Sequence, residues 1–236
     1  MGVAKQMEIN QTRYDEKLLI TTEIIKKTEE ITIYRYIKRI IDIVISIIGI
    51  ILLIPIIAIL WIANFVSKDN GPIFYTQDRI GKNGKYFKLY KFRSMVVGAD
   101  EKLTKYLAEN EEARKEYRKY KKLKNDPRIT PIGKFIRETS IDEFPQFINV
   151  LKGDMSLIGP RPYLPREKED MKDAYYYIIT CKPGLTGLWQ VSGRSDVDFE
   201  NRLKLDLEYI EKESFTYDVK LFFKTIANMF KRSGAI

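Results

Sequence analysis

The chain has 236 residues, enough for one core-forming domain and an extension. It carries 41 Lys and Arg against 32 Asp and Glu, and the formal net charge of +9 favours anionic partners such as phosphates, nucleotides, anionic lipids or nucleic acid. The absence of His and the presence of one Cys exclude imidazole catalysis, His metal sites, an intrachain disulfide and a Cys-rich zinc site. The chemistry therefore depends on carboxylates, hydroxyls, Lys, Arg or Tyr.

Three regions are predicted along the chain. Residues 1–33 are polar, carry no usable motif, and are expected to form a mobile or helical cytoplasmic extension. Residues 34–68 are expected to form a membrane segment, and 69–236 are expected to form a cytoplasmic catalytic domain with interfacial amphipathic helices. The apolar run at 43–66, IVISIIGIILLIPIIAILWIANFV, is long enough to cross a bilayer, which requires about 20 apolar residues.

Two placements of this run are open. One spanning helix is the commoner use of such a run. Pro55 instead predicts a kink, because proline removes a backbone donor, and each half would reach only about 17 Å at ~1.5 Å per residue. A helix that turns back at Pro55 keeps both basic flanks in the cytoplasm, whereas a spanning helix has no clear orientation. The flanking residues are Arg35, Lys38 and Arg39 before the run, and Lys68, Arg79, Lys82, Lys85, Lys88 and Lys91 after it.

Lys38, Arg39 and Asp42 are predicted to mark the membrane entry. Asp42 is a costly charge at the apolar border unless it is paired. A Lys38–Asp42 pair at i,i+4 spacing would help to hold the entry of a helical hairpin.

Residues 71–95, GPIFYTQDRIGKNGKYFKLYKFRSM, predict a β-hairpin, since Asn83-Gly84 between apolar-rich runs is a good turn signal. Residues 100–124 predict one charged helix with a thin apolar stripe, solvated or on the membrane surface, without chemistry. Residues 217–232 predict an amphipathic basic helix, which either lies in the membrane interface or packs as an ordinary terminal helix. The fold class is therefore α-rich α+β, with a re-entrant helix–break–helix membrane segment, a helical cytoplasmic domain and a small β-hairpin.

The stretch TSIDEFPQF, residues 139–147, places Asp142 and Glu143 among apolar residues. Ser140-x-x-Glu143 fits a capping box, which requires no function. Alternatively, the helix dipole and free amides of a first turn would keep Asp142 ionised, and an ionised Asp is a competent nucleophile toward phosphorus. Glu143 lies roughly 100° further around the helix, so it could bind a metal or accept a proton.

Further residues around this pair suit phosphates. Arg137 lies five residues before Asp142, and the prolines of GPRP present Arg161 on a stiff loop, although a surface turn with an incidental Arg has the same sequence. The loop KPGLTGLWQVSGR, residues 182–194, has glycines that permit close backbone approach. A hard divalent cation held by carboxylates, most naturally Mg²⁺ on Asp142 and Glu143, is the predicted metal.

These motifs, in this order, resemble the bacterial sugar transferases, which are monotopic polyprenol-phosphate phosphoglycosyl transferases. The resemblance runs from about residue 34 to the C-terminus and favours the compact type of member. It implies transfer of a sugar-1-phosphate from a UDP-sugar to undecaprenyl phosphate at the cytoplasmic face of the plasma (inner) membrane, which initiates exopolysaccharide, capsule, O-antigen or glycoprotein glycan synthesis. It also implies a re-entrant helix broken at Pro55. The residues that carry it are KRIIDI, GPIFYTQDRIGKNGKYFKLYKFRSM, DPRITPIGKFIRETSIDEFPQFINVLKGDMSLIGPRP and KPGLTGLWQVSGR.

By this resemblance, Asp142 forms a covalent phosphosugar–enzyme intermediate and releases UMP, with ping-pong kinetics. Glu143 binds Mg²⁺ or deprotonates the lipid phosphate, and these two roles stay open. Galactose or glucose is the favoured sugar, with an N-acetylated amino sugar as the alternative. The predicted phosphate ligands are Lys91, Arg93, Arg137 and Arg161.

The predicted partners are a UDP-sugar, undecaprenyl phosphate and plasma membrane lipids; a homodimer is left open and nucleic acid is not expected. Two other classes compete with this interpretation: a catalytically silent membrane scaffold and a basic nucleic-acid binder. The intact Asp142–Glu143 pair with Arg161 argues against the scaffold. The basic charge gathers near the membrane run rather than on a stacking platform, which argues against nucleic acid.

Overall fold

The computed structural model describes residues 2–66, 71–121, 123–193 and 197–230. It divides into two units, Met1–Ile41 and Asp42–Ile236, so the division falls inside the predicted membrane segment 34–68. The described residues of the first unit are helical and belong to α1 (Gly2–Val66), which continues into the second unit. All other elements belong to the second unit.

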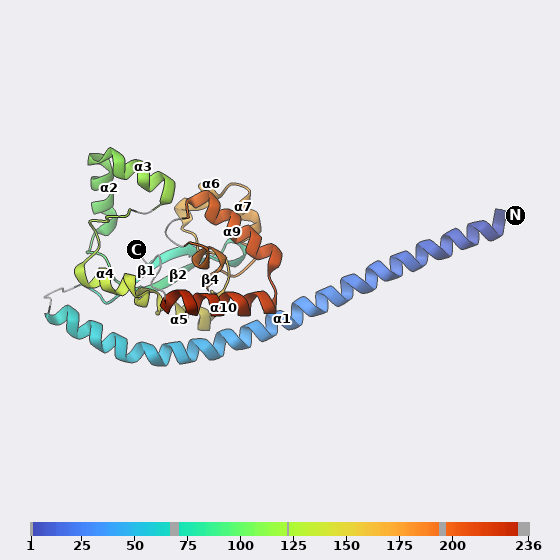
Figure 1. The fold of residues 1–236 in the computed structure, drawn as a ribbon, viewed down its shortest axis with the longest axis horizontal. Helices are drawn as coiled ribbons and strands as arrows, with labels where there is room; N and C mark the ends of the chain where they lie inside the picture. Colours follow the sequence, from blue (N-terminus) through green and yellow to red (C-terminus); the bar gives the residue numbers. More distant parts are fainter. Residues whose placement is uncertain (1, 67–70, 122, 194–196, 231–236) are drawn as a thin grey trace. The chain divides into compact units, whose positions relative to one another are not determined.

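The membrane run is one helix in the structure. Residues 42–66 of α1 continue through Pro55, so the predicted division into two separate helices is not seen in this part of the chain. A proline inside a helix removes one backbone hydrogen bond and bends the axis, and Figure 1 shows this part of α1 as a continuous, curved ribbon. By length and composition, Ile33–Val66 is long and apolar enough to cross a membrane.

Asp42 is buried at the start of the second unit. Its carboxylate accepts a hydrogen bond from the Ser156 hydroxyl at 3.1 Å and one from the Leu157 amide at 2.9 Å. These two hydrogen bonds come from a strand of the same unit, and they offset the free-energy cost of burying the Asp42 carboxylate. The predicted Lys38–Asp42 pair stays a prediction.

Beyond Asp42, the same face of α1 packs against the rest of the second unit. An ideal Cβ at Gly49 would lie 2.5 Å from the ring of Phe147, so only glycine permits this close approach. Leu53 is buried in one apolar cluster with Phe92 and Ile136. The remaining faces of α1 carry exposed apolar side chains, among them Val44, Ile47, Ile48, Ile51, Leu52, Ile54, Ile59, Trp61, Ile62, Phe65 and Val66.

The predicted β-hairpin is confirmed. β1 (Phe74–Ile80) pairs antiparallel with β2 (Tyr86–Phe92), and Ile80 faces Tyr86 next to the turn. The turn contains η1 (Lys82–Gly84), in which Asn83 and Gly84 have φ angles of 57° and 73°. The Asn-Gly pair is suited to this turn because both residue types tolerate positive φ.

A second sheet, which the sequence did not predict, joins the two loops that contain Gly and Pro. β3 (Ser156–Ile158) pairs in parallel with β4 (Gly184–Thr186). A Cβ at Gly184 would lie 2.2 Å from the amide nitrogen of Gly159, and a Cβ at Gly187 would lie 2.1 Å from the Gly159 carbonyl oxygen. Glycine therefore permits direct backbone contact between the loops.

Helices precede and follow the second sheet. α5 (Gln146–Lys152) ends just before Gly153, whose φ of 89° confirms the predicted stop. Other helical elements after the hairpin are α4 (Pro131–Glu138), η2 (Ile141–Glu143), η3 (Pro165–Glu167), α6 (Lys168–Met171), α7 (Ala174–Ile178), α8 (Leu188–Val191), α9 (Phe199–Lys212) and α10 (Phe215–Phe230).

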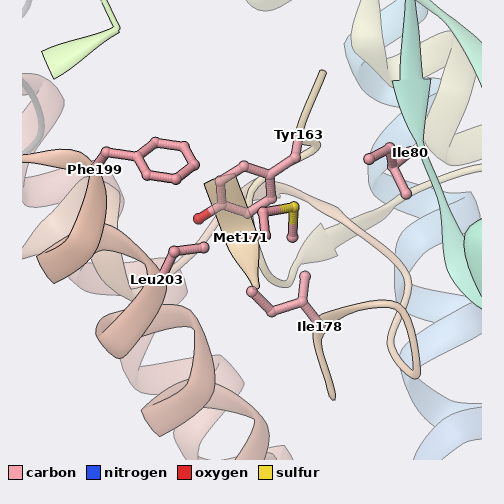
Figure 2. Packing of buried hydrophobic residues seen from close by; sticks show 6 residues of the cluster. All are labelled: Ile80, Tyr163, Met171, Ile178, Phe199 and Leu203. Atoms are coloured by element: carbon pink, nitrogen blue, oxygen red, sulfur yellow. The ribbon is translucent and has the colours of Figure 1, made fainter. Parts of the chain in front are cut away.

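The core between α9 and the hairpin centres on Tyr163. Figure 2 shows its ring between the side chains of α9 and Ile80 of β1, and it meets Phe199 edge to face at 5.9 Å between centroids. Because Tyr163 follows the GPRP loop directly, this packing fixes the end of that loop. The buried members of the cluster are Ile80, Tyr163, Met171, Ile178, Phe199 and Leu203.

The sequence predicted one solvated helix for the charged segment 100–124, and this prediction is wrong. The segment forms α2 (Ala99–Glu109) and α3 (Glu111–Tyr120). The division falls at Asn110, whose side chain accepts a hydrogen bond from the Ala113 amide at 3.0 Å and so caps α3. The apolar stripe is covered within the segment, in a small core of Leu103, Tyr106, Leu107, Ala113, Tyr117 and Leu123.

The predicted C-terminal helix 217–232 is confirmed up to Phe230 as α10, whereas residues 231 and 232 lie outside the described residues. This helix has two apolar faces. Leu221 is 2% exposed, and the Asp218 carboxylate on the same side accepts a hydrogen bond from the Tyr209 hydroxyl at 2.8 Å. Phe215, Val219 and Phe223 form an exposed stripe with i,i+4 spacing on another side. The helix therefore packs on the domain, as a terminal helix does, and also presents an exposed apolar stripe; its position in a membrane interface stays a prediction.

Candidate active site

Asp142 and Glu143 lie in η2, a single 3₁₀ turn. The Ser140 side chain makes no capping hydrogen bond and its φ is 57°, so the capping-box interpretation is wrong. The Asp142 side chain is 11% exposed, whereas the Glu143 side chain is 41% exposed. Both border one cavity of about 850 Å³. Helix capping therefore does not explain why Asp142 is buried at this position.

Lys91 of β2 lies beside both carboxylates. Its Nζ is 2.8 Å from Oε1 of Glu143 and 3.8 Å from Oδ2 of Asp142. It therefore contacts the acidic pair that the sequence singled out, across a long stretch of chain. Lys88, two residues earlier, instead pairs with Asp78 on the exposed side of the hairpin at 2.8 Å.

Burial raises the pKa of Asp142 to about 6. Lys91 opposes the shift most strongly, Glu143 adds to it, and Arg137 again opposes it. The local backbone hydrogen bond lowers the pKa of Asp142, as expected near a helix start, but desolvation has the larger effect. At neutral pH the carboxylate is still mainly ionised, as nucleophilic attack requires.

Substitution Lys91→Met should raise the pKa of Asp142 further, since it removes the cation that most favours the ionised form. The acidic limb of the pH profile of kcat/KM for the sugar donor should then move to higher pH by roughly one unit. Lys88→Met is the control and should leave the limb in place. An acidic limb at the same pH in Lys91→Met as in wild type would show that Lys91 does not influence the ionisation of Asp142.

Arg137 of α4 and Arg161 of the GPRP loop border the same cavity. The guanidinium carbon of Arg161 lies 5.1 Å from the centroid of the Trp189 ring, and that of Arg202 lies 4.9 Å from it. These distances are typical of cation–π contacts, which hold the guanidinium planes in place. Arg93 also borders the cavity, but its Nε donates to the Pro72 carbonyl at 2.6 Å.

Arg79 of β1 and Arg202 of α9 are among the arginines of the cavity that sequence reasoning did not assign. Both are buried, and burial, followed by the nearby Arg161 charge, lowers the pKa of each to about 10, so both are charged at neutral pH. The sequence placed Arg79 only in the basic flank of the membrane run, yet it donates to the Pro162 carbonyl at 2.8 Å. No spacing pattern relates these residues, because separate segments bring them together.

Asp206 of α9 holds the GPRP loop from inside the domain. It is fully buried, and its Oδ2 accepts hydrogen bonds from the Arg161 amide at 3.2 Å and the Tyr163 hydroxyl at 2.7 Å. Burial raises the pKa of Asp206 to about 7, although both hydrogen bonds oppose the shift. The loop that presents Arg161 is therefore attached to α9 at two points.

The acidic pair suits a hard cation. Asp142 and Glu143 offer carboxylate oxygens at one cavity, and the Lys91 ammonium beside them shows that positive charge is favoured there. Across the described ranges of the chain, no group of three or more His, Cys, Asp and Glu side chains could hold a metal ion. Mg²⁺ is commonly bound by one or two carboxylates together with substrate phosphates, so the residues present fit the predicted Mg²⁺.

A buried carboxylate beside lysine and arginine side chains, on a domain with a long exposed apolar helix, suits phosphate chemistry at a membrane surface. Residues 33–232 match the family described as bacterial sugar transferase, and the chain belongs to this family.

Three relatives indicate the range of similarity. The chain is 49% identical over 201 residues to undecaprenyl-phosphate galactose phosphotransferase of Salmonella typhimurium, a match that covers 85% of this chain and 42% of that protein. It is 36% identical over 209 residues to UDP-glucose:undecaprenyl-phosphate glucose-1-phosphate transferase of Escherichia coli, again with 85% and 42% covered. It is 40% identical over 190 residues to exopolysaccharide production protein ExoY of Sinorhizobium fredii, with 80% and 83% covered. The chain thus spans well under half of the first two relatives.

Proposed function

We propose that the protein transfers a sugar-1-phosphate from a UDP-sugar to undecaprenyl phosphate and releases UMP, as the initiating step of exopolysaccharide, capsule or O-antigen synthesis. The observation that carries this proposal is the buried Asp142 beside Glu143 and Lys91, in a cavity that Arg137 and Arg161 also border. The names of relatives that act on galactose or glucose support one of these two sugars as the donor's sugar.

The proposed reaction has two displacements at one phosphorus atom. An Asp142 carboxylate oxygen attacks the phosphorus that carries the sugar, and the bond from this phosphorus to the bridging oxygen breaks, so that UMP leaves with that oxygen. A phosphate oxygen of undecaprenyl phosphate then attacks the same phosphorus, and the Asp142 carboxylate leaves. The product carries its sugar on a lipid-linked diphosphate.

The residues around Asp142 have separate tasks in this scheme. Lys91 favours the ionised nucleophile, while Arg137 and Arg161 offset charge on the phosphates. Glu143 is exposed enough to take a proton from the incoming lipid phosphate or to hold Mg²⁺. When bound, Mg²⁺ supplies further charge neutralisation at the phosphates.

A monotopic, re-entrant placement at the cytoplasmic face of the plasma membrane fits the packing of α1. The packed face of α1 runs from buried Asp42, through buried Leu53, to partly buried Leu60. From Asp42 to Leu60 this is about 27 Å at ~1.5 Å per residue. A helix attached over that length would have to carry polar domain surface into the hydrocarbon to cross it. A shallow placement bent at Pro55 leaves the exposed apolar faces in lipid and the domain in water.

UMP release from a panel of UDP-sugars tests the proposal, with the protein in nanodiscs that contain undecaprenyl phosphate and Mg²⁺. We expect turnover with UDP-galactose or UDP-glucose, and about one UMP per enzyme when the lipid acceptor is omitted. Turnover only with an N-acetylated amino-sugar donor would select the alternative donor class. No release from any UDP-sugar by folded, membrane-bound protein would contradict the proposal and favour the scaffold.

A further inference from the structure

The lining of the cavity beside Asp142 also contains apolar side chains that the proposed chemistry does not use. They include side chains from four separate elements: α1, α5, β4 and α10. We call this set the apolar wall. Its members are Ile45, Phe147, Leu185, Phe222 and Ile226.

The apolar wall extends to the protein surface along α10. Ile226 is 36% exposed, so the apolar wall reaches the surface at this residue. On α1, Val44 and Ile48 flank Ile45 and are 51% and 53% exposed. The apolar wall therefore reaches from the cavity to the protein surface at α10 and at α1.

The apolar wall does not match a UDP-sugar, because the uracil, the diphosphate and the sugar of that donor all carry polar groups. A polyprenol phosphate needs both kinds of surface in one cavity: cations for its headgroup, and apolar side chains for the chain next to it. Lys91, Arg137 and Arg161 supply the cations, and the apolar wall supplies the second requirement.

We propose that the apolar wall binds the isoprenoid chain of the phosphate acceptor, at the units next to its phosphate, and that the chain reaches the cavity from lipid past α10 and α1. This inference rests on the proposed function and adds the site of the second substrate. It commits to the prenyl phosphate rather than to a bulk phospholipid, because the cavity joins the wall to the acidic pair where the acceptor phosphate must react.

The test compares Phe222→Ser with Phe223→Ser. These neighbours have the same side chain, but Phe222 lines the cavity, whereas Phe223 lies on the exposed face of α10. The readout is the ratio of kcat/KM for undecaprenyl phosphate to kcat/KM for a short-chain alkyl phosphate, at equal membrane-bound protein. We expect this ratio to fall about tenfold in Phe222→Ser and to stay within about twofold of wild type in Phe223→Ser.

The UMP burst without acceptor reports in each variant that the nucleophile is assembled. A normal burst with an unchanged ratio in Phe222→Ser, or an equal fall in Phe223→Ser, overturns this inference alone; the second result would mean that only bulk lipid contacts the helix. A wild type without a burst overturns the proposed function as well. Ile226→Asn against Val219→Asn repeats the comparison at partly exposed positions, where misfolding is not expected, and the same fall must appear in Ile226→Asn.

Discussion

Asp142→Asn should lower UMP release from the accepted UDP-sugar by about 10⁴-fold, in the presence and in the absence of lipid acceptor. The amide keeps the size of the side chain but lacks the anionic oxygen that attacks phosphorus, and removal of a nucleophile typically has an effect of this order. Single-turnover measurement of UMP is the assay. Glu143→Gln is the matched control: its nucleophile remains, so slow release should still be detectable.

The loss in Asp142→Asn should not come from unfolding. A pKa raised to about 6 means that the fold favours the neutral carboxyl, so this group contributes most stability at low pH and that contribution is lost as pH rises from about 4 through 6. Asn stays neutral, so at pH 8 the variant should be more stable than wild type, by up to about 3 kcal/mol. Near-wild-type turnover in this variant would contradict the assignment of the nucleophile.

Gly184→Ala should destabilise the protein by about 3 kcal/mol, because a new methyl group has no space between two backbone segments. Its Cβ would lie 2.2 Å from the Gly159 amide nitrogen and 2.4 Å from the Thr186 carbonyl oxygen. Strands β3 and β4 would have to separate, which displaces the loop that presents Arg161. Thermal unfolding followed by circular dichroism should show a Tm lower by about 6–12 °C.

Gly98→Asn is the control for this substitution. Gly98 has a φ of 74°, and an added Cβ would have only the Glu101 Oε2 atom within reach, at 3.7 Å. Asn tolerates this left-handed conformation, so the Tm should change little. A similar fall in both variants, or no fall in Gly184→Ala, would show that the backbone contact between the two loops does not limit stability.

Features with local causes could be predicted from the sequence. The hairpin turn depends on Asn83-Gly84, and the end of α5 depends on Gly153, whose φ is positive as in many helix caps. Asp142 and Glu143 were recognised because adjacent carboxylates among apolar residues are unusual. The structure places both at one cavity with Lys91.

Features that depend on distant segments could not be predicted in this way. The β3–β4 pairing is parallel and carries no turn signal, and Arg79 and Arg202 reach the cavity only through the folded arrangement. Ser140-x-x-Glu143 has the letters of a capping box, but the chain adopts a positive φ at Ser140 and the box does not form. Local patterns do not encode these outcomes, because tertiary contacts decide them.

If Asp142 is the nucleophile, it carries the sugar phosphate during the reaction. This can be measured by incubating membrane-bound protein with its UDP-sugar and Mg²⁺, without acceptor, followed by acid quench and peptide mass spectrometry. We expect a sugar-phosphate adduct on the Asp142 peptide, one UMP per adduct, and loss of the adduct when undecaprenyl phosphate is added. UMP release that requires both substrates, with the Asp142 peptide unmodified, would contradict this role of Asp142.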